Sequence, residues 1–291
     1  MNESSLCVIG DAFFDVCVPT HHLVKGGAFS RNISISPGGT ANVSVWASRL
    51  GIISKFIGKV GNDPLGHAFR NDLKNEKVAD LTLTDNIHST GICVSLIDEE
   101  GNRTMVTSRG ANDHWVIGEM EGLLGYIEGC KILYTVGYSL ISERNAMVLE
   151  TLVRSAKEKG SEIWFNPGAY NIIGDRCISF MSNLVDVLIL NLDEGRFLTG
   201  EDSVITIIDA LSKKVATVIM TLGEKGSVAS STKEYVLSDS IHVSPVVDTT
   251  GAGDAFTAGF ISARMTQCDL KQSCELAHLL AAQVIQRPGG R

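Results

Sequence analysis

The chain has 291 residues, of which 44% are hydrophobic and 20% charged, and its formal net charge is −8. This composition is typical of a globular protein with a sizeable core. The acidic balance argues against nucleic acid and anionic membranes as partners. No apolar run approaches the roughly 18 residues that span a bilayer, and the first residues lack the basic start of a secretory signal. We therefore expect a cytoplasmic protein whose partners are small molecules.

Seven cysteines are scattered along the chain, and no two of them form a Cys-x-x-Cys pair. An odd total without such pairs favours neither a disulfide framework nor a metal site. We expect buried free thiols in a reducing compartment.

Short apolar segments that predict strands alternate with amphipathic segments that predict helices. Strands are expected over residues 6–10, 53–57, 131–136, 161–165, 185–190 and 215–221. Helices are expected between most of them, for example over 64–77, 142–159 and 203–213. This alternation predicts an α/β fold, a mostly parallel sheet with helices on both faces. Ligands of such sheets bind at the carboxyl ends of strands, where Asn166, Asn191 and Thr221 lie.

Two stretches interrupt the alternation of strands and helices. Residues 13–20 with 32–37, and 91–97 with 103–108, look extended and have no helix between them. The second pair is joined by a short polar segment that contains Gly101-Asn102, which indicates a β-hairpin. We expect extended segments within residues of about 13–37 and 91–108.

A glycine-rich turn opens a predicted helix in the first fifth of the chain. Its sequence is Pro37-Gly38-Gly39-Thr40-Ala41-Asn42. Gly38 and Gly39 let backbone amides approach a small polar ligand, and Asn42 offers two donors and an acceptor. Taken alone, the segment is more typical of an ordinary loop-to-helix junction.

The most informative segment is Asp248-Thr-Thr-Gly-Ala-Gly-Asp254, which precedes an apolar run that predicts a helix. The backbone amides of Gly251, Ala252 and Gly253 would be uncovered at the helix N-terminus, where such groups form an anion site. A carboxylate at Asp254 could take the proton from an attacking hydroxyl while the amides hold charge on a transferring phosphoryl group. The segment favours a phosphotransferase; the alternative is a helix cap or dipole partner.

Together the two glycine-rich segments resemble the paired signatures of the ribokinase-like (PfkB) carbohydrate kinase family. Other segments resemble the family in its own order. Asp15 follows the first predicted strand, as the family's sugar-hydroxyl aspartate does. Arg109-Gly-Ala-Asn112 resembles the family's lid-proximal turn. Asn191-Leu-Asp-Glu194 resembles its Asn-x-x-Glu element near the phosphates and magnesium. Thr221-Leu-Gly-Glu-Lys-Gly226 is similar to its nucleotide-loop pattern. The resemblance implies one ribokinase-like kinase domain over residues 1–291. Its lid would be a small β-sheet formed by residues of about 13–37 and 91–108.

The resemblance also implies an activity and roles for named residues. The activity is ATP-dependent phosphorylation of a hydroxymethyl group on a free sugar or sugar acid, with Asp254 as general base and an amide anion hole at residues 251–254. The acceptor's other hydroxyls would be held by Asp15, Gly38, Gly39 and Asn42. The ATP cleft would be lined by Asn166, Asn191, Glu194, Thr221, Gly223 and Gly226.

Metal ions and one arginine complete the implied site. Glu194 would act on Mg²⁺ through bound water, since magnesium usually keeps several waters. Asp248 resembles a ligand of the monovalent cation, K⁺, that many members bind. Arg109 could clamp a carboxylate or phosphate on the acceptor, or form an interdomain ion pair. A homodimer through the lid is implied by analogy.

Three departures from the family pattern bear on the substrate and the cleft. The turn at residues 38–42 is one residue shorter than the ribokinase form Gly-Gly-x-x-Ala-Asn, and no acidic residue lies around Tyr134–Tyr138, where ribokinase contributes one. Both argue against assigning ribose. The chain stops at Arg291, where many members continue, so part of the nucleotide cleft's usual wall is expected to be absent or trimmed.

Other functions compatible with the sequence differ in class. A nucleoside kinase of the same fold would need a slot for a base, which Phe13, Phe14 or Tyr138 could supply. A non-catalytic regulatory member is the remote alternative, which the intact Asp254 motif disfavours. A dinucleotide-dependent oxidoreductase is disfavoured because no Gly-x-Gly-x-x-Gly follows the first predicted strand.

Overall fold

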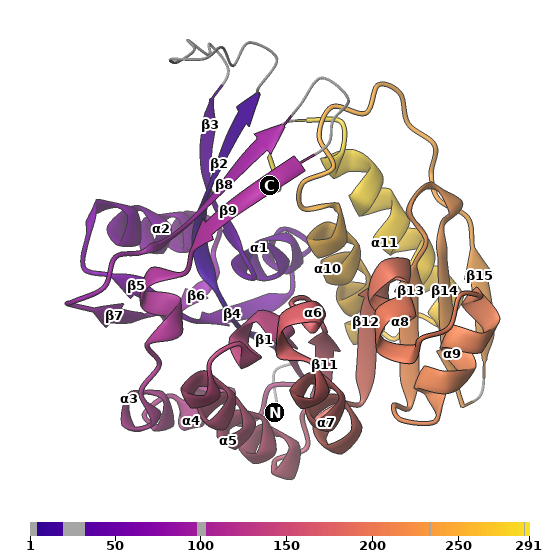
Figure 1. Cartoon of the computed structure of the whole chain (residues 1–291), viewed down its shortest axis with the longest axis horizontal. Helices are drawn as coiled ribbons and strands as arrows, with labels where there is room; N and C mark the ends of the chain where they lie inside the picture. The colour runs from indigo at the N-terminus through magenta and orange to yellow at the C-terminus, as the bar shows by residue number, and fades with distance from the viewer. Residues whose placement is uncertain (1–4, 20–32, 98–102, 233, 288) are drawn as a thin grey trace.

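The computed structural model describes residues 5–19, 33–97, 103–232, 234–287 and 289–291. Within these residues the largest sheet has nine strands (Figure 1). In spatial order they are β15 (Tyr235–Ser238), β14 (Ser227–Ser231), β13 (Thr217–Thr221), β12 (Val187–Asn191), β11 (Glu162–Asn166), β10 (Ile132–Val136), β1 (Ser5–Ile9), β4 (Ile53–Ile57) and β6 (Ala79–Asp80). The strands from β13 to β6 are parallel, and β14 and β15 are antiparallel additions at one edge. The predicted mostly parallel sheet is confirmed.

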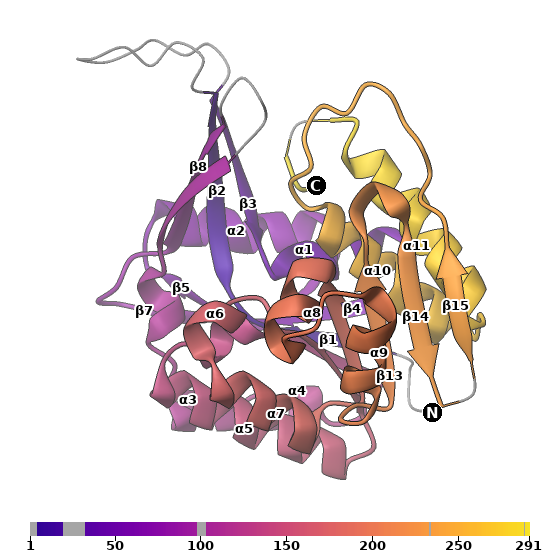
Figure 2. The same cartoon turned by 45° about the vertical axis from the view of Figure 1, so that its right-hand side comes forward.

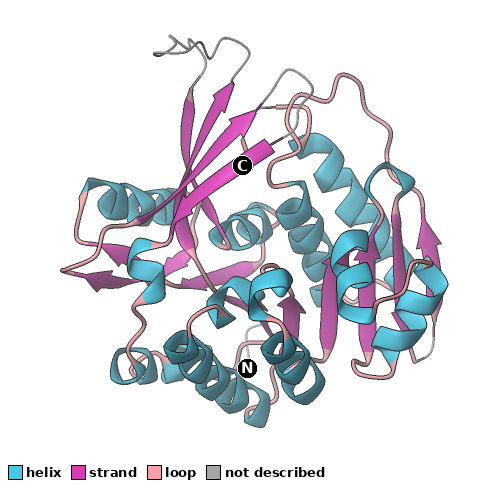
Figure 3. Ribbon diagram, in the orientation of Figure 1, coloured by secondary structure: helices cyan, strands magenta, loops and turns pink. Residues whose placement is uncertain are grey.

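Helices cover both faces of this sheet because its strands are apolar on both sides. In β1, Leu6 and Val8 belong to one buried cluster and Cys7 and Ile9 to the other, as the alternation of side chains in a strand requires. The first cluster is completed by α1 (Ala41–Arg49), α2 (Pro64–Asn75), α10 (Ala252–Met265) and α11 (Leu270–Val284). The second is completed by α3 (Ile117–Glu121), α4 (Leu124–Ile127), α5 (Glu143–Glu158), α6 (Tyr170–Ile173), α7 (Asp175–Leu184), α8 (Leu192–Thr199) and α9 (Val204–Ser212). The two layers of helices are visible in Figure 3.

A second, smaller sheet rises from the carboxyl edge of the first (Figures 1 and 2). Its strands lie in the order β3 (Ser34–Gly39), β2 (Ala12–Pro19), β8 (Gly91–Ile97) and β9 (Arg103–Ser108). Strand β2 pairs parallel with β8, and the outer pairs are antiparallel, so the predicted hairpin at 91–108 is confirmed. Residues 20–32 and 98–102, which fall within the two predicted segments, lie outside the described residues.

The two faces of the small sheet differ in chemistry, because side chains alternate along each strand. One row across the sheet is polar and consists of Ser36, Asp15, Cys93 and Thr107. The next row is apolar and consists of Ile35, Val16, Val94 and Val106. Asp15, Cys93 and Thr107 line a cleft, so the polar row marks the inner face.

Short elements connect the two sheets. Strands β5 (Lys59–Gly61) and β7 (Leu83–Asp85) pair parallel beside them. Single 3₁₀ turns are η1 (Gly110–Asp113), η2 (Gly137–Leu140) and η3 (Gly223–Lys225). No helix in the described ranges is long and apolar enough to cross a membrane. All seven cysteines are free thiols and five of them are buried, in agreement with the sequence analysis.

Candidate active site

A cleft of about 860 Å³ lies between the carboxyl edge of the large sheet and the inner face of the small sheet. This volume is within the range of small-molecule sites. Asn166, Asn191 and Thr221 line it together, and Asn191 and Thr221 are direct neighbours in the β12–β13 register. The structure therefore brings these three predicted residues to one edge of the sheet.

The start of α10 forms another wall of the cleft. Gly251 precedes the helix in the left-handed conformation, with φ of 74°. A Cβ atom on it would lie 2.5 Å from the Cα atom of Gly290, so both backbone angle and space require glycine there. Thr250, Gly251, Gly253 and Asp254 line the cleft, whereas the side chain of Ala252 does not. The amide of Ala252 donates to the carbonyl of Thr249 at 3.3 Å, whereas the next amides of the first turn have no acceptor within the helix, which suits an anion.

Asp254 and Asn42 meet at this end of the cleft, although they are 212 positions apart in the chain. The Nδ2 atom of Asn42, in the first turn of α1, donates to Oδ2 of Asp254 at 2.9 Å. Burial raises the pKa of Asp254 to about 6, while the Asn42 hydrogen bond and the positive charge of Arg291 act in the opposite direction. Asp254 thus has a pKa close to neutrality, which suits a general base.

Asp15 faces the same space from strand β2. Burial and the neighbouring charge of Asp254 raise its pKa to about 6, and Arg291 opposes the shift. A Cβ atom at Gly38 would lie 1.8 Å from Oδ2 of Asp15, so Gly38 leaves room for this carboxylate and does not itself line the cleft. Gly39 does line it. Four of the predicted acceptor residues, Asp15, Gly39, Asn42 and Arg109, therefore border one space.

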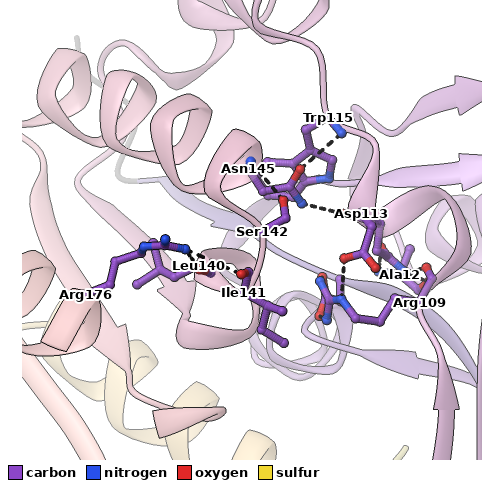
Figure 4. A network of polar contacts seen from close by, with 11 residues as sticks. Ala12, Arg109, Asp113, Trp115, Leu140, Ile141, Ser142, Asn145 and Arg176 are labelled. Atoms are coloured by element: carbon purple, nitrogen blue, oxygen red, sulfur yellow. Dashed lines mark hydrogen bonds and ion pairs between the residues drawn. The ribbon is translucent and has the colours of Figure 1, made fainter. Parts of the chain in front are cut away.

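Arg109 lines the cleft, and its guanidinium is held by two carboxylates. Its Nη1 and Nη2 atoms donate to the two oxygens of Asp11 at 2.7 and 3.0 Å, and its Nε atom donates to Asp113 at 2.6 Å. Figure 4 shows Arg109 and Asp113 turned toward each other. The ion pair that the sequence analysis offered as one alternative is present. The alternative role, as a clamp for an acidic group on the acceptor, stays a prediction.

Asn112 of η1, three residues after Arg109, holds the start of strand β2. Its side chain accepts from the amide of Ala12 at 2.8 Å and donates to the carbonyl of Ala12 at 2.9 Å. Asn112 is fully buried, so both bonds are shielded from water. The two bonds fix the point where the chain passes from β1 of the large sheet into β2 of the small sheet.

A second set of polar contacts supports the cleft at the end of β10 (Figure 4). The Nη1 atom of Arg176 donates to the carbonyls of Leu140 and Ile141 at 2.8 and 3.4 Å. Nearby, the Oδ1 atom of Asn145 accepts from the backbone amide of Trp115. The backbone amide of Asn145 donates to the hydroxyl of Ser142. Ile141 lines the cleft, so these bonds hold part of its surface in place.

Glu194 lies at the nucleotide end expected from the sequence, and it also caps α8. Its Oε2 atom accepts from the amide of Asn191 at 2.8 Å, and Oδ1 of Asn191 accepts from the amide of Glu194 at 2.8 Å. Burial raises the pKa of Glu194 to about 7, against the hydrogen bonds from Asn191 and Asn166. The carboxylate therefore has a structural role and still borders the cleft.

The remaining predicted residues lie away from the lining of the cleft. Gly223 and Gly226 are in and after η3, and a Cβ atom at Gly226 would lie 2.0 Å from the carbonyl oxygen of Ser238. Asp248 accepts from the amide and hydroxyl of Thr250 at 2.8 and 2.7 Å, and from the amide of Gly289 at 2.9 Å. The proposed roles of these three residues stay predictions.

Sequence reasoning missed several polar residues of the site. Asp11 directly follows the first strand, a position that could have indicated a site residue. Arg291 reaches Asn42 from the far end of the chain, and Asp72 reaches Arg291 from α2. No motif or periodicity contains these last two residues, so only the fold reveals them.

The fold and the cleft define a class of protein. A mostly parallel sheet carries polar residues at its strand ends, and beside them a half-buried carboxylate lies at the N-terminus of a helix, where an anion is favoured. That arrangement is suited to phosphoryl transfer between two small molecules.

The comparisons with known proteins identify the family. The family model described as pfkB family carbohydrate kinase matches residues 3–291. The chain therefore belongs to the PfkB family of carbohydrate kinases, and it is a phosphotransferase that acts on alcohol groups.

Individual relatives span nearly the whole chain. A ribokinase of Haemophilus influenzae is 26% identical over 99% of this chain and 94% of its own. The structure of an Arabidopsis thaliana ribokinase complexed with ribose and ATP is similar with a TM-score of 0.84 and 25% identity, over 98% of this chain and 94% of that one. An adenosine kinase from Sinorhizobium meliloti has a TM-score of 0.91 and 24% identity, over 99% and 96% of the two chains, which shows a shared fold.

Proposed function

We propose that the protein transfers the γ-phosphoryl group of ATP to a hydroxymethyl group of a free sugar, with Asp254 as the general base. The observation that carries this proposal is the Asn42–Asp254 hydrogen bond at the first turn of α10, in a cleft that also contains Asn191 and Thr221. The acceptor would lie near Asp15, Gly39 and Asn42, under the small sheet. ATP would lie along the strand ends.

The proposed step needs one base and one anion site. Oδ2 of Asp254 is occupied by Asn42, so its other oxygen is the one to take the proton of the acceptor hydroxyl. The hydroxyl oxygen forms a bond to the γ-phosphorus as the bond from that phosphorus to the bridging oxygen breaks, and ADP leaves. The amides of the 251–254 turn would hold the charge on the transferring group.

Glu194 fits the role of a water-mediated ligand of Mg²⁺. Its buried carboxylate has a raised pKa, which a nearby cation would lower, and oxygen is the ligand atom that magnesium prefers. The described residues contain no group of three or more His, Cys, Asp or Glu side chains arranged to hold a metal. That is the pattern expected where magnesium is bound mainly by substrate phosphates and water. When bound, magnesium neutralises charge on the phosphates.

The charges of the cleft favour a neutral acceptor over a sugar acid. Its described lining contains four carboxylates, of Asp11, Asp15, Glu194 and Asp254, against the one guanidinium of Arg109. That guanidinium is already paired with Asp11 and Asp113. An acidic group on the acceptor would have to displace one of these carboxylates.

A nucleoside kinase is the second candidate, and the apolar part of the cleft favours it. Phe13, Tyr138 and Ile172 all line the cleft. The Phe13 and Tyr138 rings could contact a base, whereas Phe14 is buried outside the lining. A purely regulatory role is disfavoured by the intact Asp254 site.

Three further assignments belong to this proposal. The chain forms one kinase domain over residues 1–291, with residues 13–37 and 91–108 as its lid. Asp248 binds K⁺ near the 251–254 turn, although its carboxylate already accepts three hydrogen bonds.

The apolar outer row of the small sheet, in which Ile35 and Val106 are each 63% exposed, pairs with that of a second copy. Analytical ultracentrifugation of the wild type and of Val106→Glu tests the dimer, and a monomeric wild type would refute it.

The function is tested by following ADP formation from ATP and magnesium with separate neutral sugars, sugar acids, sugar phosphates and nucleosides. We expect turnover with a neutral sugar and a product phosphorylated at its primary hydroxyl, identified by ³¹P NMR. Turnover with nucleosides alone would favour the second candidate. ATP binding without turnover on any acceptor would contradict the proposal.

A further inference from the structure

A chain of polar contacts runs behind the Asn42–Asp254 pair and links four segments that are remote in sequence. Asp72 of α2 pairs with Nη1 of Arg291. The Nε atom of Arg291 donates to Oδ1 of Asn42 at 2.7 Å, and Nδ2 of Asn42 donates to Asp254 at 2.9 Å. The side chain of Arg291 is only 8% exposed, so the contacts are largely shielded from solvent.

The backbone around Arg291 is held by separate contacts. The carbonyl of Gly290 accepts from Nε1 of Trp46 at 3.0 Å, one helical turn after Asn42 in α1. The amide of Gly289 donates to Asp248 at 2.9 Å. The close approach of Gly290 to Gly251 seats this segment directly against the first turn of α10. Arg291 therefore enters the site from a fixed backbone.

The guanidinium determines which way the amide of Asn42 can point. Arginine has five N–H donors and no acceptor, so the atom of Asn42 that faces it must be the oxygen. The amide nitrogen then faces Asp254, whose ionised carboxylate has only acceptors. The reversed amide would place two donors together on one side and two acceptors together on the other.

We propose that Arg291 is a positioning residue, which holds Asn42 in the orientation that fixes Oδ2 of Asp254 and leaves its other oxygen free for the acceptor hydroxyl. This inference rests on the proposed function for its catalytic meaning. The orientation of Asn42 itself is a property of the folded chain.

The inference predicts a change in the ionisation of Asp254. The Asn42 hydrogen bond and the charge of Arg291 both favour the carboxylate form, against burial. Other titratable groups line the same cleft: Asp11, Asp15, Cys93, Arg109, Tyr134, Tyr138 and Glu194. Arg109 is the cation among them, and it is paired with Asp11 and Asp113, whereas the positive charge that acts on Asp254 is that of Arg291.

The first test is a titration of Asp254 that does not depend on activity. Protein labelled with ¹³C at aspartate carboxyl groups is titrated by NMR, with Asp254→Asn to assign the signal. We expect a higher pKa for Asp254 in Arg291→Met than in the wild type. The matched control is Arg287→Met. The guanidinium of Arg287 lies over the ring of Trp46, 5.3 Å from its centroid, and not against Asn42. The pKa of Asp254 in this control should equal that in the wild type. An unchanged pKa in a folded Arg291→Met protein would overturn the inference.

The second test is a double-mutant cycle on kcat/KM. Arg291→Met should lower kcat/KM roughly 10- to 100-fold in the wild-type background, mainly through kcat, since misplaced catalytic groups cost about this much. In an Asn42→Ala background the same change should cost clearly less than in the wild-type background, because only the direct effect of the Arg291 charge on Asp254 is then lost. Equal losses in both backgrounds would show a merely structural role and overturn the inference. If Arg291→Met does not fold, Asp72→Asn replaces it in both tests, with the same direction expected and a smaller size.

These tests separate the inference from the proposed function. If the wild type phosphorylates no acceptor, the function fails, and the NMR titration still decides whether Arg291 controls Asp254. If the wild type is active and the titration is unchanged, only the inference fails.

Discussion

At the scale of residues, the site is governed by carboxylates with raised pKa values, and Asp15 and Asp254 are both half-buried. Asp254 and Asp15 both have a pKa of about 6, because burial disfavours their charged forms. The negative charge of Asp254 adds to the rise in the pKa of Asp15. A buried acid of this kind is protonated at mildly acidic pH and ionised above it.

The pH dependence of activity follows from these shifts. A general base must be deprotonated, so kcat/KM should rise with pH through about 6 and level off above that, where Asp254 is ionised. The measurement is a pH profile of kcat/KM with a saturating nucleotide. Asn42→Ala should move the rising limb to higher pH, because it removes a hydrogen bond that favours the carboxylate. A rise of kcat/KM near pH 4 would contradict a base whose pKa is raised by burial.

The sequence indicated some of these residues and could not indicate others. Asp254 and Asn42 lie in glycine-rich turns with recognisable spacing, and both reach the cleft. Arg291 and Asp72 lie in segments without a motif, and their positions depend on how α2 and residues 289–291 pack against α1. Contacts between segments more than 200 positions apart come from the tertiary fold, which local patterns do not encode.

At the scale of elements, capping explains why the helices begin where they do. Asp63 caps α2 by accepting from the amide of Gly66 at 2.7 Å, and the same carboxylate accepts from the amide and hydroxyl of Thr90 at 2.7 and 2.8 Å. Asp63 thus ties the start of a helix to the segment that leads into β8. Burial opposes its ionisation, but these hydrogen bonds outweigh it and lower its pKa.

Replacing this cap should destabilise the protein. Asp63→Ala should lower the free energy of unfolding by about 2 to 4 kcal/mol, since it removes a cap and leaves buried Thr90 donors without an acceptor. The control is Asp269→Ala at the exposed cap of α11, with an expected loss of about 1 kcal/mol. Urea denaturation measures both, and equal losses would contradict the role of Thr90.

The contribution of the Asp63 cap to the free energy of unfolding depends on pH. A lowered pKa in the folded state stabilises the protein above the unfolded value of about 4, and this contribution is lost as the pH falls below it. The difference between wild type and Asp63→Ala should therefore shrink from pH 7 to pH 3. A constant difference would contradict a contribution from the ionised carboxylate.

The elements themselves were largely predictable. The strands expected at 53–57 and 131–136 match β4 and β10 to within one residue, because their apolar runs are short and bounded. The extended segments of the small sheet were predicted from the missing helices, and their assembly into a sheet from the family resemblance. Its parallel β2–β8 pairing was not, since these strands are about 80 positions apart and no local signal sets their register.

At the scale of the whole molecule, the cleft depends on two sheets of different chemistry. The large sheet packs apolar side chains on both faces, and the polar residues Asn166, Asn191 and Thr221 lie at its carboxyl edge. The small sheet turns a polar row toward that edge and an apolar row away from it. A closing lid would exclude water from the reacting groups, as phosphoryl transfer requires. The family was predictable because several motifs occur in order, whereas the acceptor was not, because it depends on side chains that meet only in the folded chain.

The central claim is that Asp254 takes the proton of the acceptor hydroxyl. The most direct measurement compares wild type with Asp254→Asn for single-turnover phosphoryl transfer, with calorimetric binding of ATP and acceptor to both proteins. We predict that Asp254→Asn binds both ligands within a few-fold of the wild type, while phosphoryl transfer slows by about 10²- to 10⁴-fold. Transfer at the wild-type rate in Asp254→Asn, with both ligands bound, would contradict it.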